Sequence, residues 1–134
     1  MPNYVVLKVI DSLNKNGKCL KNSKILILGV AFKKDADDKR ESPGIEIIYI
    51  LKGKGATIDY HDPHIPSFSG MRHYPNLAMK SVGLSKKQLK QCDCVVIITD
   101  HSEYDYPWIL KNSKLIVDTR NATKNIKSGK IVKA

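Results

Sequence analysis

The chain has 134 residues and a formal net charge of +10, with 42% hydrophobic and 27% charged residues. A domain of this length buries roughly two-thirds of its unfolded surface, so one full domain is expected and a second is not. No apolar run approaches the roughly 20 residues of a membrane span, which argues against a membrane partner. The excess of 23 Lys and Arg over 13 Asp and Glu favours anionic partners, whether phosphates, nucleic acid or acidic protein surfaces.

The start of the chain and its cysteines both indicate a cytoplasmic protein. Residues 1–3 lead directly into an amphipathic segment, without the basic and apolar regions of a secretory signal. Cys19, Cys92 and Cys94 suit a reducing compartment better than a disulfide framework. Cys92 and Cys94 would share one face if the following strand includes both, and small buried hydrophobes explain them better than a catalytic nucleophile.

The first half of the chain predicts a helix followed by a βαβ unit. Apolar residues at helical spacing predict a helix between Tyr4 and Leu20, with Gly17 near its end; they are Val5, Val6, Val9, Ile10 and Leu13. The nearly continuous apolar run 24–32 is typical of a strand that is covered on both faces. Ser42-Pro43 predicts the start of a second helix, and residues 56–63 read as the next parallel strand.

The second half predicts two further strands and a possible edge strand. Residues 64–83 are rich in turn formers, so we expect a surface excursion without regular structure. Ser85 and Gln88 form a capping-box pattern for a short helix, before a strand at 94–100 and a helical turn at 102–112. A fourth strand is expected at 114–120, and the tail is a candidate edge strand. The predicted fold is a three-layer, Rossmann-like α/β domain with a parallel sheet and flanking helices, preceded by a linker helix.

The carboxyl ends of the predicted strands define one candidate binding surface, because ligands of open parallel sheets bind there. The segments 29–34, 61–62, 99–101 and 118–120 should converge on it. Phe32 offers a flat apolar face, Lys33 a compact charge and Arg120 a fork for two phosphate oxygens, which together suit a diphosphate. The alternative, a solvated loop whose lysines pair with neighbouring acids, remains open.

Other site types are disfavoured by the sequence. The spaced glycines of a dinucleotide fingerprint do not follow the first strand. His61 and His64 flank a proline without further clustered ligands, so no metal site is expected. Nucleic-acid binding would rest on charge alone, because the lysines are scattered and no recognition-module signature is present.

Three motifs together carry a family resemblance: GVAFKKDADDKRESPG at 29–44, YHDPHIP at 60–66 and VDTRNAT at 117–123. In this order they resemble the C-terminal, UDP-binding domain of the UDP-glucose/GDP-mannose dehydrogenase family. The similarity is greatest to the branch that oxidises UDP-N-acetylglucosamine and UDP-N-acetylmannosamine, and UDP-glucose 6-dehydrogenase is the alternative within the family. The resemblance extends over essentially the whole chain.

The resemblance implies a fold, partners and site residues. Residues 1–22 would be the end of a central linker and dimerisation helix, and 23–134 the UDP-sugar-binding domain. Phe32, Lys33 and Arg120 would contact the nucleotide-sugar, and Arg40 would reach toward NAD held by an N-terminal domain. The full-length enzyme, expected as a homodimer, would oxidise the sugar C6 alcohol to a carboxylate by two hydride transfers to NAD, through an aldehyde and a cysteine thioester.

The chain departs from the family at the catalytic centre. It contains neither the glycine-rich NAD fingerprint nor the glycine-flanked nucleophilic cysteine with its partner lysine. We therefore expect no catalytic residue in this chain, which would be an inactive fragment of a longer enzyme. The other interpretation is a nucleotide- or anion-binding module that functions without catalysis.

Overall fold

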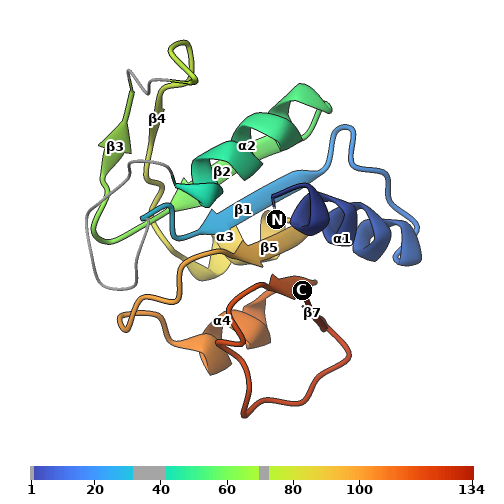
Figure 1. The fold of residues 1–134 in the computed structure, drawn as a ribbon. Coiled ribbons are helices and arrows are strands. Elements are labelled where there is room, and N and C mark those ends of the chain that lie inside the picture. Colours follow the sequence, from blue (N-terminus) through green and yellow to red (C-terminus); the bar gives the residue numbers. More distant parts are fainter. Residues whose placement is uncertain (1, 32–41, 70–72) are drawn as a thin grey trace.

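The computed structural model describes residues 2–31, 42–69 and 73–134, and its centre is a five-stranded sheet in the order β2-β1-β5-β6-β7 (Figure 1). Every neighbouring pair of strands in this sheet is parallel. The strands are β1 (Lys24–Leu28), β2 (Thr57–His61), β5 (Cys94–Ile97), β6 (Ile116–Asp118) and β7 (Ile131–Lys133). The predicted parallel α/β fold is confirmed, and the tail does form an edge strand.

Helices cover both faces of the sheet and make the three layers. Helices α1 (Pro2–Lys15) and α2 (Pro43–Gly53) pack on one face, and α3 (Lys86–Gln91) and α4 (Tyr106–Asn112) on the other (Figure 1). Strand β1 is buried on both faces. Its residues Ile25 and Ile27 belong to one core cluster, and Leu26 and Leu28 belong to the other. This is the two-sided burial that its continuous apolar run predicts.

Local signals set the ends of the helices. Ser42 caps α2 by accepting a hydrogen bond from the Ile45 N–H, and Pro43 takes the first helical position, as predicted. Helix α1 ends at Lys15, earlier than its expected limit, because Gly17 has a φ of 74° and the Lys18 N–H turns back to the Leu13 carbonyl at 3.0 Å. No helix of the described residues is long and apolar enough to cross a membrane.

The expectation of an irregular surface excursion at 64–83 is wrong in part. This segment contains a two-stranded antiparallel sheet of β3 (Ser67–Phe68) and β4 (Met79–Lys80). Phe68 is buried in the core with its ring 5.3 Å from the Tyr60 ring, and the Val82 N–H donates to the Tyr60 carbonyl at 2.8 Å. Turn-forming residues marked the bends correctly but hid the two short strands between them.

The two neighbouring cysteines do not share a face. Strand β5 begins at Cys94, while Cys92 follows the last residue of α3, so they pack in different core clusters. Burial raises the pKa of the Cys92 thiol to about 11 and raises that of Cys94 as well. Both thiols are therefore protonated at neutral pH, and the interpretation as buried hydrophobes is confirmed.

Candidate functional site

The carboxyl ends of four strands meet at one edge of the sheet, because their registers are aligned. Leu28 at the end of β1 pairs with His61 of β2 on one side and with Ile97 of β5 on the other, and Ile97 pairs with Asp118 of β6. Strand order reverses at β1, since the chain goes from β1 to β2 and then crosses to β5. We call this edge the strand-end rim; it is the place where open α/β sheets bind ligands.

Asp62 fastens the loop after β1 to two other segments of the rim. Its buried carboxylate accepts hydrogen bonds from the Val30 N–H at 2.8 Å and the Ala31 N–H at 3.0 Å. The same oxygen lies 2.9 Å from Nε2 of His101, which is fully buried on the loop after β5. The other oxygen accepts from the His64 N–H at 2.8 Å. One side chain thus holds three segments that are distant in sequence.

The loop after β1 and the end of β5 are in direct contact at Gly29. This glycine has a φ of 87°, and a Cβ placed on it would lie 2.5 Å from Cβ of Thr99. The Thr99 hydroxyl donates to the Ala31 carbonyl at 2.7 Å, which closes the junction. The close approach of backbone at Gly29, just beyond the tip of β1, is therefore a contact within the protein.

Asp118 organises the turn after β6. Its fully buried carboxylate accepts hydrogen bonds from the Arg120, Ala122 and Thr123 N–H groups, at 2.9 to 3.1 Å, and from the Thr123 hydroxyl at 2.6 Å. Burial raises the pKa of this carboxyl, but the hydrogen bonds from Thr123, Ala122 and Arg120 outweigh it, so the pKa lies below its ordinary value. Asp118 is an anion at neutral pH.

Arg120 is exposed at the rim and is oriented by the neighbouring strand. Its Nε–H donates to the Ile98 carbonyl at 2.9 Å, just beyond the end of β5. This bond uses the inner nitrogen of the guanidinium, and within the described residues no ion pair occupies its terminal nitrogens. These two nitrogens are the fork that binds phosphate or carboxylate oxygens.

Phe32, Lys33 and Arg40 lie outside the described residues, so their predicted roles stay predictions. What the structure describes is the backbone that leads to them, because Gly29, Val30 and Ala31 are held by hydrogen bonds at the rim. Ala31, the last described residue before Phe32, therefore lies at the same edge of the sheet as Arg120.

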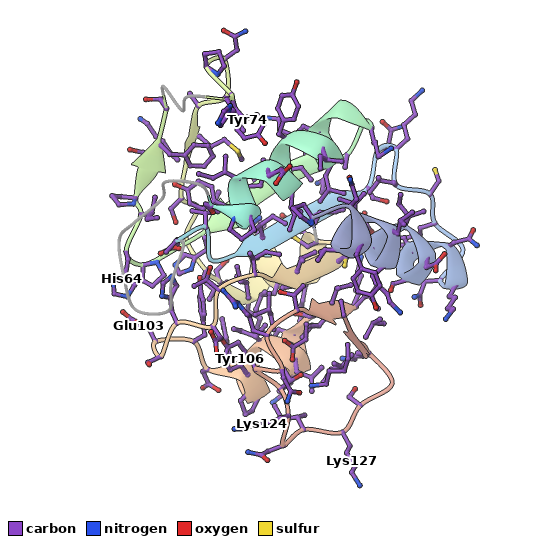
Figure 2. The ribbon with its side chains drawn as sticks, viewed as in Figure 1. His64, Tyr74, Glu103, Tyr106, Lys124 and Lys127 are labelled. Atoms are coloured by element: carbon purple, nitrogen blue, oxygen red, sulfur yellow. The ribbon has the colours of Figure 1, made fainter. Side chains whose placement is uncertain are left out.

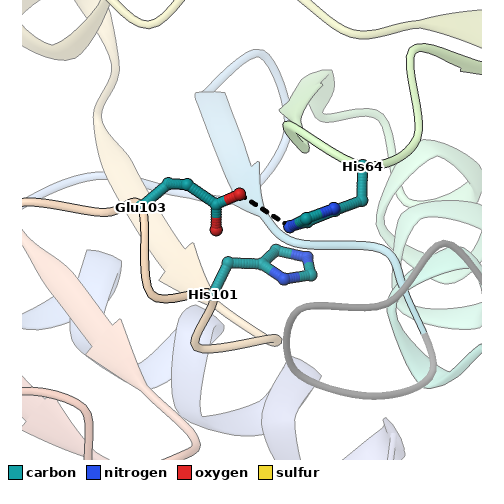
Figure 3. Close-up of side chains that lie close together, drawn as sticks. All are labelled: His64, His101 and Glu103. Atoms are coloured by element: carbon teal, nitrogen blue, oxygen red, sulfur yellow. Dashed lines mark ion pairs between the residues drawn. The ribbon is translucent and has the colours of Figure 1, made fainter.

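Three potential metal ligands come together at the rim, although the sequence did not predict them as a group. His64, His101 and Glu103 place one ligand atom each within 4.8 Å of the others (Figure 3). All three groups already have partners: His64 Nε2 lies 2.8 Å from a Glu103 oxygen, and His101 Nε2 lies 2.9 Å from an Asp62 oxygen. Figure 2 shows His64 and Glu103 side by side at the periphery. The three side chains are thus held by contacts with one another and with Asp62.

The sequence placed Asp62, Thr99 and Asp118 at the rim, but it did not reveal that their hydrogen bonds hold the rim together. The sequence does contain a local signal for the turns that Asp118 and Asp62 form. Asp118 is followed within five residues by Asn and Thr, a pattern typical of a turn closed by its aspartate, and Asp62 precedes a proline in the same way. The distant partners of Asp62 and Thr99 carry no local signal, because they meet only in the folded sheet.

A doubly wound α/β domain with an oriented arginine at its strand-end rim belongs to the nucleotide-binding class of folds by its geometry. Residues 26–125 match the family model described as the UDP-glucose/GDP-mannose dehydrogenase family, UDP binding domain. The chain therefore belongs to this family and corresponds to its UDP binding domain.

Curated relatives agree with the family model. The chain is 35% identical over 130 residues to UDP-N-acetyl-D-mannosamine dehydrogenase of Methanococcus maripaludis, with 90% of this chain and 27% of the relative covered. It is 32% identical over 129 residues to UDP-glucose 6-dehydrogenase of Rickettsia prowazekii, with 92% of this chain and 29% of the relative covered. The chain thus spans somewhat more than a quarter of the length of these relatives.

Solved structures show the same fold. The UDP-N-acetyl-mannosamine dehydrogenase of Staphylococcus aureus superposes with a TM-score of 0.72 in its derivative structure, at 25% identity, over 98% of this chain and 30% of that one. The corresponding Pyrococcus horikoshii dehydrogenase gives a TM-score of 0.78 at 23% identity, with 98% of this chain and 30% of that chain covered. This identity supports the fold alone.

Proposed function

We propose that this chain is the UDP-sugar-binding part of an NAD-dependent nucleotide-sugar 6-dehydrogenase, which oxidises the sugar C6 alcohol to a carboxylate. The observation that carries the proposal is Arg120, which a buried aspartate and the Ile98 carbonyl orient at the rim of a UDP binding domain. Relatives named for UDP-N-acetyl-D-mannosamine support an N-acetylhexosamine nucleotide as substrate. UDP-glucose is the second candidate, because relatives named for it align over 92% of the chain.

In this proposal the residues of the chain bind and orient substrate. The guanidinium of Arg120 takes two oxygens of the diphosphate, Lys33 adds a second positive charge and Phe32 packs against the nucleotide-sugar. Two hydrogen-bonded cations suit a diphosphate because hydrogen bonds between charged groups are roughly twice as strong as neutral ones. The rim supplies a rigid edge for these contacts, since Asp62, Thr99 and Asp118 tie its segments together.

The oxidation itself belongs to a part of the enzyme outside this chain. NAD would accept the two hydrides while held mainly by an N-terminal domain, and Arg40 would reach toward it. A cysteine that forms a thioester must be accessible as a thiolate. Cys92 and Cys94 are buried and protonated, and we assign no catalytic role to exposed Cys19. Alone, the chain is proposed to bind without turnover.

The first helix is proposed to connect the domain to that N-terminal part and to a second subunit. Residues 1–22 would end the central helical region, with 23–134 forming the binding domain. Tyr4 and Leu7 of α1 are 47% and 62% exposed, which is high for large apolar side chains on one helix and favours a covering partner. Unpaired cysteines at 19, 92 and 94 agree with a cytoplasmic enzyme.

Calorimetric titration of the chain with UDP, UDP-N-acetylglucosamine and NAD tests the proposal. We expect UDP ligands to bind and NAD to give no heat. Arg120→Ala should weaken UDP binding roughly tenfold to a hundredfold, the worth of a charged hydrogen-bonded contact. Lys127→Ala is the matched control, because Lys127 is an exposed cation on the loop before β7 (Figure 2).

Two outcomes would contradict the proposal. If Arg120→Ala and Lys127→Ala lost the same amount of affinity for UDP, binding would depend only on the net charge of the chain. Binding of single-stranded nucleic acid in preference to UDP, with affinity that falls by orders of magnitude between roughly 50 and 200 mM salt, would favour a nucleic-acid partner instead.

A further inference from the structure

The last strand carries a lysine that contacts the turn of Arg120. Lys133 of β7 is the register partner of Asp118, and its ammonium nitrogen lies 3.2 Å from an Asp118 carboxylate oxygen. It also donates to the Asn121 side-chain oxygen at 3.1 Å and to the Thr123 hydroxyl at 2.9 Å. An ammonium has three N–H donors, so each of them has an oxygen partner on this one turn.

We infer that Lys133 is a positioning residue for Arg120, which rests on the proposed role of Arg120 in binding the nucleotide-sugar. The side chains of Lys133, Thr123 and Asp118 are all hydrogen-bonded to one another. The ammonium donates to the hydroxyl and to the carboxylate, and the hydroxyl donates to the same carboxylate. Asn121, beside Arg120, has a φ of 57°, in the left-handed region that Asn adopts more readily than most residues. The Lys133 contact to its side chain joins this part of the turn to β7.

The arrangement has a functional consequence because Arg120 lies inside the turn that Lys133 closes. When the turn takes several conformations, only a fraction of molecules present the guanidinium at the rim, and the apparent affinity falls by that fraction. Lys133 itself is half exposed, with 47% of its side chain accessible, so its replacement removes the contact to the turn without opening the core.

Titration with UDP in a set of variants separates positioning from simple charge. Lys133→Met should weaken UDP binding by about fivefold, a fraction of the effect of losing a charged contact outright. Lys130→Met removes the same charge three residues away, from a lysine whose ammonium donates to the Leu110 carbonyl at 3.4 Å, and UDP affinity should stay within about twofold of the wild type. In an Arg120→Ala background, Lys133→Met should have no further effect, because the two residues act through one another.

A second measurement tests the contact without a ligand. Amide hydrogen exchange at Arg120, Ala122 and Thr123, whose N–H groups bind Asp118, should be faster in Lys133→Met and unchanged in Lys130→Met. Unchanged exchange in Lys133→Met would overturn the inference whether or not UDP binds. The inference would also be overturned if Lys133→Met weakened UDP binding as much in the Arg120→Ala background as in the wild type. It would be overturned as well if the effect of Lys133→Met on UDP affinity disappeared at high salt. Absence of UDP binding by the wild-type chain, with faster exchange in Lys133→Met, would contradict the proposed function and leave the turn contact established.

Discussion

Asp62 directly follows β2 and Asp118 is the last residue of β6, yet the partners of these two buried aspartates differ in kind. Apart from the nearby His64 N–H, Asp62 binds N–H groups and a histidine that are 31 to 39 residues away in sequence. Asp118 binds mainly groups within five residues, apart from Lys133. The first aspartate therefore holds the sheet's loops to one another, and the second shapes one turn. Loss of Asp62 should act on folding, and loss of Asp118 more on binding.

The largest expected effect is that of Asp62→Asn. The amide keeps one oxygen but places an NH₂ group against donors, and it breaks a fully buried contact with His101, so we expect a loss of about 3 kcal/mol in the free energy of unfolding. Urea denaturation followed by circular dichroism measures it. Asp59→Asn is the control, because Asp59 lies on the preceding strand β2, is half-buried and accepts a hydrogen bond from the Gln88 amide. Equal effects of the two changes would remove the distinction between a rim anchor and an ordinary strand residue.

Gly29→Ala should come next, at about 2 to 3 kcal/mol, because the added Cβ would meet Thr99 and the backbone has a positive φ. The matched control is Gly53→Ala at the end of α2, where nothing lies within 4 Å of an added Cβ. That change should be neutral or slightly stabilising, since alanine is the better helix former. Comparable stability of both variants would show that the loop after β1 can move away from β5.

Asp118→Asn should lower stability by about 2 kcal/mol at pH 7 and should change its dependence on pH. The pKa of Asp118 is lower in the folded chain than in the unfolded one, so its contribution is complete above the unfolded value of about 3.9 and is lost as the pH falls through the folded value. The difference between wild type and variant should therefore shrink below about pH 4. Denaturation curves between pH 7 and 3 check this, and a constant difference would contradict it.

The smallest expected effect is that of Thr99→Val, about 1 kcal/mol, because it removes one hydrogen bond to the Ala31 carbonyl at nearly constant volume. Thr57→Val on the exposed start of β2 should change stability by less than half of that. A loss of more than about 3 kcal/mol would mean that Thr99, rather than Asp62, is the main link across the rim.

The architecture was predictable from the sequence wherever burial dominates. The apolar run of β1 predicted a strand covered on both faces, and the Ser42-Pro43 pair predicted the start of α2 to the residue. The rim was predictable as a place, because strand ends must converge, and Arg120 was found there. Its supporting contacts were not predictable, since the partners of Asp62 and Lys133 are set by the strand order, which no local pattern contains. The short strands β3 and β4 were missed for a different reason, because turn-forming residues lie on both sides of them.

The segment between β2 and α3 has a consequence for self-association. Strand β2 is an edge of the main sheet, and an uncovered edge invites pairing with another chain. The Val82 N–H donates to the Tyr60 carbonyl and the Ser81 hydroxyl accepts from the Asp62 N–H, so this segment covers the carboxyl end of that edge. At the opposite edge β7 is only three residues long and carries Lys133. The sheet is therefore protected against edge-to-edge aggregation at both edges. Residues 81 and 82 cover the end of β2, and β7 is short and carries a charged residue.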